Sequence, residues 1–320
     1  MKPFDKLRTS NKTMKHLNNE VISVSAPGKL MLLGEHAVVY GYPCIVSSVN
    51  KYITVTAKSI YQKTDSIITD GHKDLSFVKK TLEVFRERYS VRSTFSLTIK
   101  SELGNFGLGT SAAVTVATFA ALVQLFGRQI SRNELFDLCY KIVLSIQGVA
   151  SGFDVASCIY GATIYFDGKR KVAQVVSDKK LPLVVGFSGK KVETVPMMEK
   201  VAQLKKQNPK LVEDIFTEVA ALVEKGKKAI EEHNWSRLGD LMDKNQVLLE
   251  KLEVSSEALS RLISLCKEKG AWGVKLSGAG GGDCIIAIGS EEKRTTIQQV
   301  INQTGGQVIS LDVGIGRGVI

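Results

Sequence analysis

The sequence predicts an α+β protein of two domains. The chain has 320 residues, of which 44% are hydrophobic and 23% are charged, a composition typical of a globular protein with a substantial core. Its first half mixes strand-like alternation with helical spacing, whereas long charged amphipathic helices dominate after Pro182. We therefore expect a loose tail over residues 1–20, a first domain over 21–181 and a second domain over 182–320.

Each element of the first domain follows from a local pattern. Alternating or apolar runs predict strands at residues 21–26, 29–34, 44–49, 52–58, 94–100, 161–166 and 172–176. Apolar residues at helical spacing predict helices at residues 75–89, 110–126, 131–146 and 155–160. Gly127 ends the second of these helices, Ser131 opens a capping box for the third, and Asp167-Gly168 is a hairpin turn. The polar stretch 65–73 is expected to be a loop.

The second domain is predicted to combine a smaller set of strands with long helices. Strands are expected at residues 183–187, 284–288 and 307–313. Helices are expected at residues 193–206, 209–232, 235–251, 255–269 and 291–303. A glycine-rich segment, 273–283, lies between two of the strands.

The first glycine-rich stretch, residues 104–113, is a candidate functional site. Its three glycines over six positions free the backbone, and an alanine-rich helix starts directly after them at Thr110 or Ser111. Such a helix start presents unpaired N–H groups and the positive end of a dipole, which bind anions, and the Ser111 hydroxyl can reach a phosphate oxygen or its magnesium. By itself the stretch is equally well a turn before a core helix. It is neither a Walker A loop nor a convincing dinucleotide fingerprint.

Composition narrows the class of protein further. Five widely spaced cysteines and four histidines without metal-ligand spacing predict free thiols, a cytoplasmic location and no structural zinc. No apolar run reaches the roughly 18 residues of a membrane span, and we expect no signal peptide. The net charge of +11 raises nucleic acid as a partner. However, the lysines alternate with glutamates and lack interleaved aromatic residues, so small anionic ligands are favoured and nucleic acid is not.

Three motifs follow one another along the chain: Pro27-Gly28-Lys29 with the segment 34–41, the segment 107–113, and the segment 275–282. In this order and at these separations they resemble the three motifs of the GHMP kinases, the family of galacto-, homoserine, mevalonate and phosphomevalonate kinases. The resemblance runs from about Val21 to the C-terminus. It implies a two-domain GHMP kinase fold, with a first domain like ribosomal protein S5 domain 2, a ferredoxin-like α/β second domain, and an active site in the cleft between them.

The resemblance also implies a role for each matching residue. Asp154 corresponds to the aspartate that accepts the substrate hydroxyl proton, and Lys29 to the lysine that pairs with this aspartate and faces the γ-phosphate. The implied nucleotide-binding residues are Gly107, Leu108, Gly109, Thr110, Ser111, Gly278, Gly280 and Gly281. The implied substrate contacts are Glu35, His36, Ser151, Thr194 and Ser277. The expected Mg²⁺ ligand is Ser111, and Glu35 is a further candidate.

Purely structural roles stay open for three of these residues. Asp154 could cap the helix 155–160, because aspartate is a preferred residue at that position. Lys29 could be a strand-end lysine that extends its amine to solvent. His36 could bind substrate or could simply fix the turn that it occupies.

The implied activity is phosphorylation of a small alcohol with ATP and Mg²⁺ as cofactors. The segments 35–41 and 245–259 are most similar to mevalonate kinases, which favours mevalonate as substrate and 5-phosphomevalonate as product, in isoprenoid synthesis. Two departures favour 5-phosphomevalonate as substrate: Val143 stands where mevalonate kinases commonly have a metal-ligating glutamate, and Asp283-Cys284 is typical of phosphomevalonate kinases. Another small-molecule kinase of the family, a catalytically inactive binding protein and a homodimer also stay open.

Overall fold

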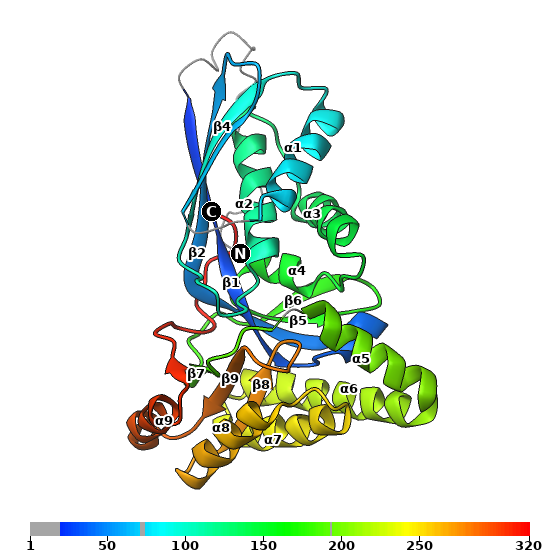
Figure 1. Cartoon of the computed structure of the whole chain (residues 1–320), viewed down its shortest axis with the longest axis vertical. Coiled ribbons are helices and arrows are strands. Elements are labelled where there is room, and N and C mark those ends of the chain that lie inside the picture. Colours follow the sequence, from blue (N-terminus) through cyan, green and yellow to red (C-terminus); the bar gives the residue numbers. More distant parts are fainter. Residues whose placement is uncertain (1–19, 71–73, 193) are drawn as a thin grey trace.

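The computed structural model describes residues 20–70, 74–192 and 194–320. In this part of the chain, two β-sheets with flanking helices lie one after the other, and Figure 1 shows the longer sheet at one end with α1, α2, α3 and α4 on one side of it. The predicted α+β class is confirmed. The expected tail lies outside the described residues except for Glu20. None of the described helices is long and apolar enough to cross a membrane.

The first sheet has six strands within the described residues, in the order β3-β4-β2-β5-β6, with β1 paired to β2. Its strands are β1 Val21–Leu33, β2 Cys44–Ile60, β3 Ser66–Asp70, β4 Thr94–Ser101, β5 Thr163–Asp167 and β6 Val172–Ser177. Its helices are α1 Ser76–Tyr89, α2 Thr110–Leu125, α3 Arg132–Gln147, α4 Phe153–Tyr160 and the 3-10 helix η2 Ala37–Tyr40. The predicted capping box is confirmed on one side, since the Ser131 hydroxyl accepts a hydrogen bond from the Glu134 N–H.

Two strand predictions and one loop prediction in the first half were wrong in their limits. Pro27-Gly28 does not divide two strands: β1 is continuous and absorbs these residues as an irregularity, because Pro27 still pairs with Tyr52 while the register shifts before Lys29. The two strands expected between residues 44 and 58 are likewise one strand, β2. The predicted loop 65–73 contains β3, a short polar strand at the edge of the sheet, which pairs in parallel with β4.

Helix α2 is the central element of the first half. All but three of its sixteen residues are buried, and it contacts β1 and β2 on one side and α1, α3 and α4 on others. A helix that is apolar all round has to be buried in this way. Because α2 is fixed on every side, its N-terminus is fixed as well.

The second sheet has the strand order β10-β7-β9-β8 in the described residues. Its strands are β7 Leu183–Phe187, β8 Gly273–Ser277, β9 Cys284–Ile288 and β10 Gln307–Val308. The helices of this half are α5 Thr194–Gln207, α6 Pro209–Glu231, α7 Trp235–Lys251, α8 Glu257–Glu268 and α9 Glu291–Gln303. The five helices and the strands β7 and β9 were predicted within two residues at each end. The strand β8 was not predicted, because residues 273–283 were expected to be a glycine-rich segment, and β10 is shorter than the predicted strand 307–313.

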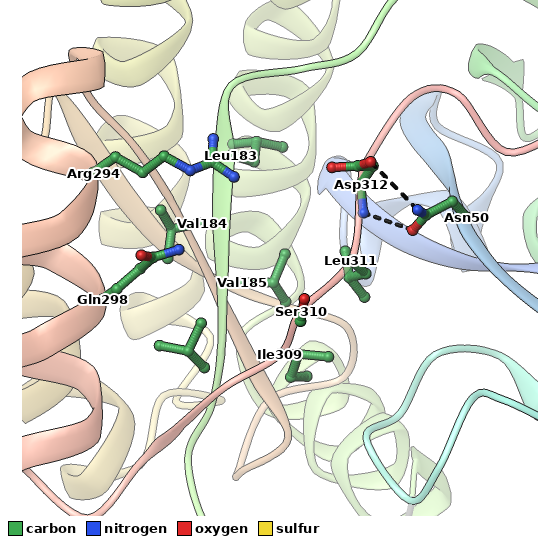
Figure 2. Close-up of a pocket in the computed structure, with 11 residues that line it drawn as sticks. Asn50, Leu183, Val184, Val185, Arg294, Gln298, Ile309, Ser310, Leu311 and Asp312 are labelled. Carbon is green, nitrogen blue, oxygen red and sulfur yellow. Dashed lines mark hydrogen bonds between the residues drawn. The ribbon is translucent and has the colours of Figure 1, made fainter.

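The last residues of the chain return to the first sheet. Ser25 and Ile320 exchange two backbone hydrogen bonds of 2.9 and 3.0 Å, and Val49 forms a bridge with Val313. Figure 2 shows the Asn50 and Asp312 side chains turned toward one another beside a pocket of about 200 Å³. There the Asp312 N–H donates to Asn50 Oδ1 at 2.6 Å. The boundary between residues 181 and 182 stays a prediction, and the C-terminal segment belongs structurally to the first sheet.

Helix α7 covers the edge strand β8 at close range. The Val274 N–H donates to Asp243 Oδ1 at 2.8 Å and the Leu276 N–H donates to Gln246 Oε1 at 3.0 Å, so side chains of α7 satisfy the open edge. The two backbones touch at Gly239, where a β-carbon would lie 2.8 Å from the Trp272 carbonyl carbon. This contact fixes β8, and with it the glycine-rich segment that follows.

We expect Gly239→Ala to destabilise the protein by about 1–3 kcal/mol, because the added methyl group meets backbone atoms that cannot move aside easily. This cost exceeds the gain of up to about 1 kcal/mol from removing a helix glycine. Urea unfolding would measure it. Lys244→Ala, at an exposed site on the same helix, is the control and should change the free energy of unfolding by less than about 0.5 kcal/mol. A Gly239→Ala protein as stable as the control would contradict the close contact.

Candidate active site

A cavity of about 1090 Å³ lies between the two halves of the chain. Its lining comes from β1, η2, the loop before α2, the loop between α3 and α4, the start of α5 and the loop between β8 and β9. In Figure 1, β8 and β9 lie between the first sheet and helices α7 and α8. Most residues that the sequence predicted as functional line this cavity, namely Lys29, Glu35, His36, Gly107, Gly109, Thr110, Ser111, Ser151, Asp154, Thr194 and Gly278.

The start of α2 has the geometry of an anion site. Gly109 occupies the cap position with φ at +83°, a left-handed conformation that favours glycine, and no side chain caps the helix. A β-carbon there would also lie 2.9 Å from the Lys29 side chain. The N–H groups of the first turn are therefore open toward the cavity. Leu108 differs from its neighbours, because its side chain is fully buried and its carbonyl accepts the Lys29 N–H at 2.8 Å.

Lys29 and Asp154 face the same cavity but do not form the direct ion pair that we expected. The Lys29 amine donates to the Gly107 carbonyl at 3.3 Å and lies 5.6 Å above the Phe153 ring. No described ion pair within 4 Å joins it to Asp154. Burial raises the pKa of the Asp154 carboxyl, and the positive charge of Lys29 opposes this rise. The carboxylate and the amine thus interact electrostatically without a direct ion pair, and both line the cavity.

The structure places a different residue at the cap of α4. Gly152 occupies the cap position, whereas Asp154 lies within the first turn, and its Oδ1 accepts the Val155 N–H at 2.9 Å. The alternative prediction that Asp154 is the helix cap was therefore wrong. The side chain of Asp154 lines the cavity from this first turn, where the positive end of the helix favours a carboxylate.

Glu35 is held by a buried partner that the sequence did not indicate. Its carboxylate forms an ion pair with the Lys275 amine, and both side chains are almost completely buried. The Asn245 amide donates a second hydrogen bond to Glu35, at 3.2 Å. Burial lowers the pKa of Lys275, and the neighbouring Glu35 opposes that effect. Both oxygens of Glu35 are thus engaged from the second half of the chain, so the structure gives no support to Glu35 as a metal ligand.

His36 and Ser277 add two more bonds between the halves. The His36 Nε2–H donates to the Ala279 carbonyl at 2.9 Å, and the Ser277 hydroxyl donates to the Met31 carbonyl at 2.9 Å. Burial lowers the pKa of His36, which keeps the ring neutral. His36 therefore fixes its turn and lines the cavity at the same time. Ser277 is buried outside the lining residues, so its predicted substrate contact has no support in the structure.

The second glycine-rich segment lines the cavity at Gly278 and Ala279, not at Gly280 and Gly281. Gly280 has φ at +86°, and a β-carbon on it would lie 2.2 Å from the Val254 carbonyl oxygen. The Gly281 N–H donates to the same oxygen at 2.7 Å. These two glycines anchor the segment to the link between α7 and α8. They do not line the cavity, so the structure gives no support to the predicted nucleotide contact at Gly280 and Gly281.

Sequence reasoning assigned no site role to Asp283 or Lys191, both of which line the cavity. The Asp283 Oδ1 accepts the Val192 N–H at 3.3 Å, and its other oxygen packs against Gly107, where a β-carbon would lie 2.7 Å away. Burial raises the pKa of Asp283, while Lys29 and Lys191 lower it. The only signal in the sequence was the unusual aspartate that ends the third motif.

The described residues contain no group of three or more His, Cys, Asp or Glu side chains that could hold a metal ion. Val143, which stands at the position of a family glutamate, is completely buried in the core and has no oxygen to offer. A metal bound here would therefore take few ligands from the protein. Mg²⁺ fits such a site, because it keeps several waters and binds through substrate phosphates with one or two protein oxygens.

An anion-binding helix start, a lysine and a carboxylate around one interdomain cavity are the parts of a phosphotransferase site. Family models support this class: the one described as "GHMP kinases N terminal domain" matches residues 76–162, and "GHMP kinases C terminal" matches residues 227–307. The chain belongs to the GHMP kinase family. It is therefore a kinase, and membership implies that it uses ATP.

Individual relatives agree with this assignment. A mevalonate kinase of Thermococcus sibiricus is 33% identical over 321 residues, which cover 90% of this chain and 95% of the relative. A mevalonate kinase of Pyrococcus abyssi is 32% identical over 318 residues, which cover 89% and 93%. The structure of the L. major mevalonate kinase in complex with R-mevalonate has a TM-score of 0.81 at 22% identity and covers 97% of this chain and 100% of that one. The predicted GHMP kinase fold is confirmed.

We expect Lys275→Met to destabilise the protein by about 3–5 kcal/mol, because it leaves the Glu35 charge buried without its partner. Combining it with Glu35→Leu should recover part of this loss, since no charge then remains buried. Urea unfolding of the single and double variants would measure both effects. Lys80→Met breaks an exposed ion pair with Glu83 and should cost less than about 1 kcal/mol. A double variant that is less stable than Lys275→Met alone would contradict the prediction.

Proposed function

We propose that this kinase transfers the γ-phosphoryl group of ATP to mevalonate and yields 5-phosphomevalonate. The observation that carries the proposal is the identity of 33% over 90% of the chain with an archaeal mevalonate kinase. The cavity supports the proposal, because the Asp154 carboxylate and the Lys29 amine line it together with the start of α2. A small carboxylate substrate also suits a cavity that offers Lys191 as a second amine.

In the proposed reaction, each residue acts through a contact that the structure makes available. The N–H groups at the start of α2 bind the nucleotide phosphates, and the Lys29 amine offsets the charge that develops on the transferred group. The Asp154 carboxylate accepts the proton of the substrate hydroxyl as the new bond to phosphorus forms. Ser151 and Thr194 line the part of the cavity where the substrate would lie.

We also propose that the enzyme uses Mg²⁺, with Ser111 as its ligand from the protein. Ser111 lies in the first turn of α2 and lines the cavity, so its hydroxyl would contribute an oxygen ligand to a bound Mg²⁺. When bound, the ion neutralises phosphate charge during transfer. The remaining ligands would be phosphate oxygens and water.

The second candidate function is that of a phosphomevalonate kinase. Lys191 and Asp283 favour it, because a phosphorylated substrate needs an additional cation and because Asp283 follows the third motif as in that branch. An inactive binding protein is disfavoured, since Lys29 and Asp154 both reach the cavity. All five cysteines are free and buried, from which we infer that the enzyme works in a reducing compartment such as the cytoplasm.

An ADP-release assay with Mg·ATP would test the substrate directly, using mevalonate, 5-phosphomevalonate, homoserine and galactose in parallel. We expect turnover with mevalonate alone. Asp154→Asn should lower kcat by roughly 10²- to 10⁴-fold, because the variant has no base for the hydroxyl proton. Turnover with 5-phosphomevalonate alone would establish the second candidate function, and turnover with none of the four would exclude both.

The pH dependence of kcat/KM provides a separate test of Asp154. Because burial raises its pKa, activity should fall on the acid side through a pKa above the value of about 3.9 that is usual for aspartate. Activity is present above this pKa, where the carboxylate is ionised, and lost below it. Lys29→Met should move the acid limb to higher pH in the residual activity, because Lys29 lowers the pKa. An acid limb that does not move in this variant would contradict the interaction.

A further inference from the structure

The loop between α3 and α4, residues 148–152, lines the cavity next to Asp154, where the substrate would lie on the proposed function. Ala150 and Ser151 line the cavity, and Asp154 follows two residues after the loop ends. Gly148 and Gly152 bound the loop with φ at +73° and +92°, and Val149 between them is half exposed. Ordering such a glycine-bounded loop costs conformational entropy, which contacts with other groups have to offset.

Two side chains from different elements hold consecutive carbonyl groups of this loop. The Tyr140 hydroxyl, on α3, donates to the Ala150 carbonyl at 3.2 Å. The Lys171 amine, from the turn between β5 and β6, donates to the Ser151 carbonyl at 2.7 Å. Neither Tyr140 nor Lys171 lines the cavity, so both act from behind the loop.

The two side chains also support one another. The Lys171 amine lies 5.4 Å above the centre of the Tyr140 ring, a favourable contact between a cation and an aromatic face. The Phe136 ring stacks on Tyr140, with 5.8 Å between the ring centres. Lys171 itself has φ at +59° and its N–H donates to the Asp167 carbonyl at 2.9 Å, which fixes the turn that carries it. The pair is thus anchored on α3 and on the β5–β6 turn.

We infer that Lys171, together with Tyr140, is a positioning residue for phosphoryl transfer: it holds the loop 148–152 so that Ser151 and Asp154 meet the substrate hydroxyl. The inference rests on the proposed role of Asp154. Lys171 lies 17 residues after Asp154 in the sequence and is not among the residues that line the cavity. A charge-assisted hydrogen bond to a carbonyl is stronger than a neutral one, which suits it to hold a loop without other regular structure.

Lys171→Met removes the amine and keeps most of the side-chain stem. We expect kcat with the accepted substrate to fall by about ten- to a hundredfold, because a displacement of about 1 Å at the reacting group costs this much. The KM for ATP should stay within about twofold, since the start of α2 does not contact the pair. Hydrogen exchange should become faster in the peptide 148–154 only, as the loop opens locally.

Three further variants separate positioning from general damage. Lys171→Arg keeps the charge and the donor and should restore kcat to within about threefold of wild type. Tyr140→Phe removes only the hydroxyl, keeps the ring, and should show a smaller effect of the same kind. Lys169→Met, at an exposed site in the same turn, should behave as wild type in every measurement.

The inference is overturned if Lys171→Met turns over at the wild-type rate, if Lys171→Arg is as impaired as Lys171→Met, or if exchange rises across the whole chain. Loss of the proposed function would look different. A wild-type protein that phosphorylates none of the four alcohols excludes that function, whereas the exchange of residues 148–154 in Lys171→Met still decides whether Lys171 holds the loop.

Discussion

The ion pair between Glu35 and Lys275 is the interaction on which the cavity depends. Two charges without access to water are tolerated only when each satisfies the other, and these two come from opposite halves of the chain. Around the pair, His36 and Ser277 add hydrogen bonds in both directions between the same two segments. Charge as well as packing therefore fixes the turn after β1 against the loop after β8. This part of the cavity wall is held in place by the protein alone, without a ligand.

The cavity is lined by groups of both charges, and the positive groups include the start of α2 and the Lys29 amine. The open N–H groups of α2 and the Lys29 amine give a positive region where phosphates would bind. Asp154, from the first half of the chain, and Asp283, from the second, line the cavity together with Lys29, and Lys29 lowers the pKa of both carboxyls. Lys29 thus opposes, without cancelling, the rise in pKa that burial causes in two carboxyls. On the proposed function, this favours the ionised form of Asp154, which can accept a proton.

Local patterns in the sequence predicted most elements, whereas the candidate site residues came from the resemblance of three short motifs to those of the GHMP kinases. The helices were predicted within two residues because their periodicity and caps are local properties. Features that depend on partners distant in the sequence were missed. The strand β3 is formed by pairing with β4, and Pro27 remains within β1 by pairing with Tyr52. In the same way, Glu35, Ser277 and Gly280 belong to motifs but contact other protein segments, and no local pattern reveals that Lys275 or Val254 is the partner. Lys191 was overlooked because a single charged residue in a loop has no periodic signal. Asp283 was noted only as a departure from the mevalonate kinase pattern, without a role in the site.

The return of the C-terminal segment to the first sheet has a consequence for biosynthesis. Ser25 binds Ile320, and Asn50 binds Asp312, so the first half of the chain gains these partners only after residues 312–320 have been synthesised. Domains usually fold in the order in which they are synthesised. Here part of the hydrogen bonding of the first sheet can form only after more than a hundred residues beyond its last strand, β6, have been translated. The first sheet is therefore completed late in synthesis, because a growing chain stalled before residue 312 would lack these hydrogen bonds.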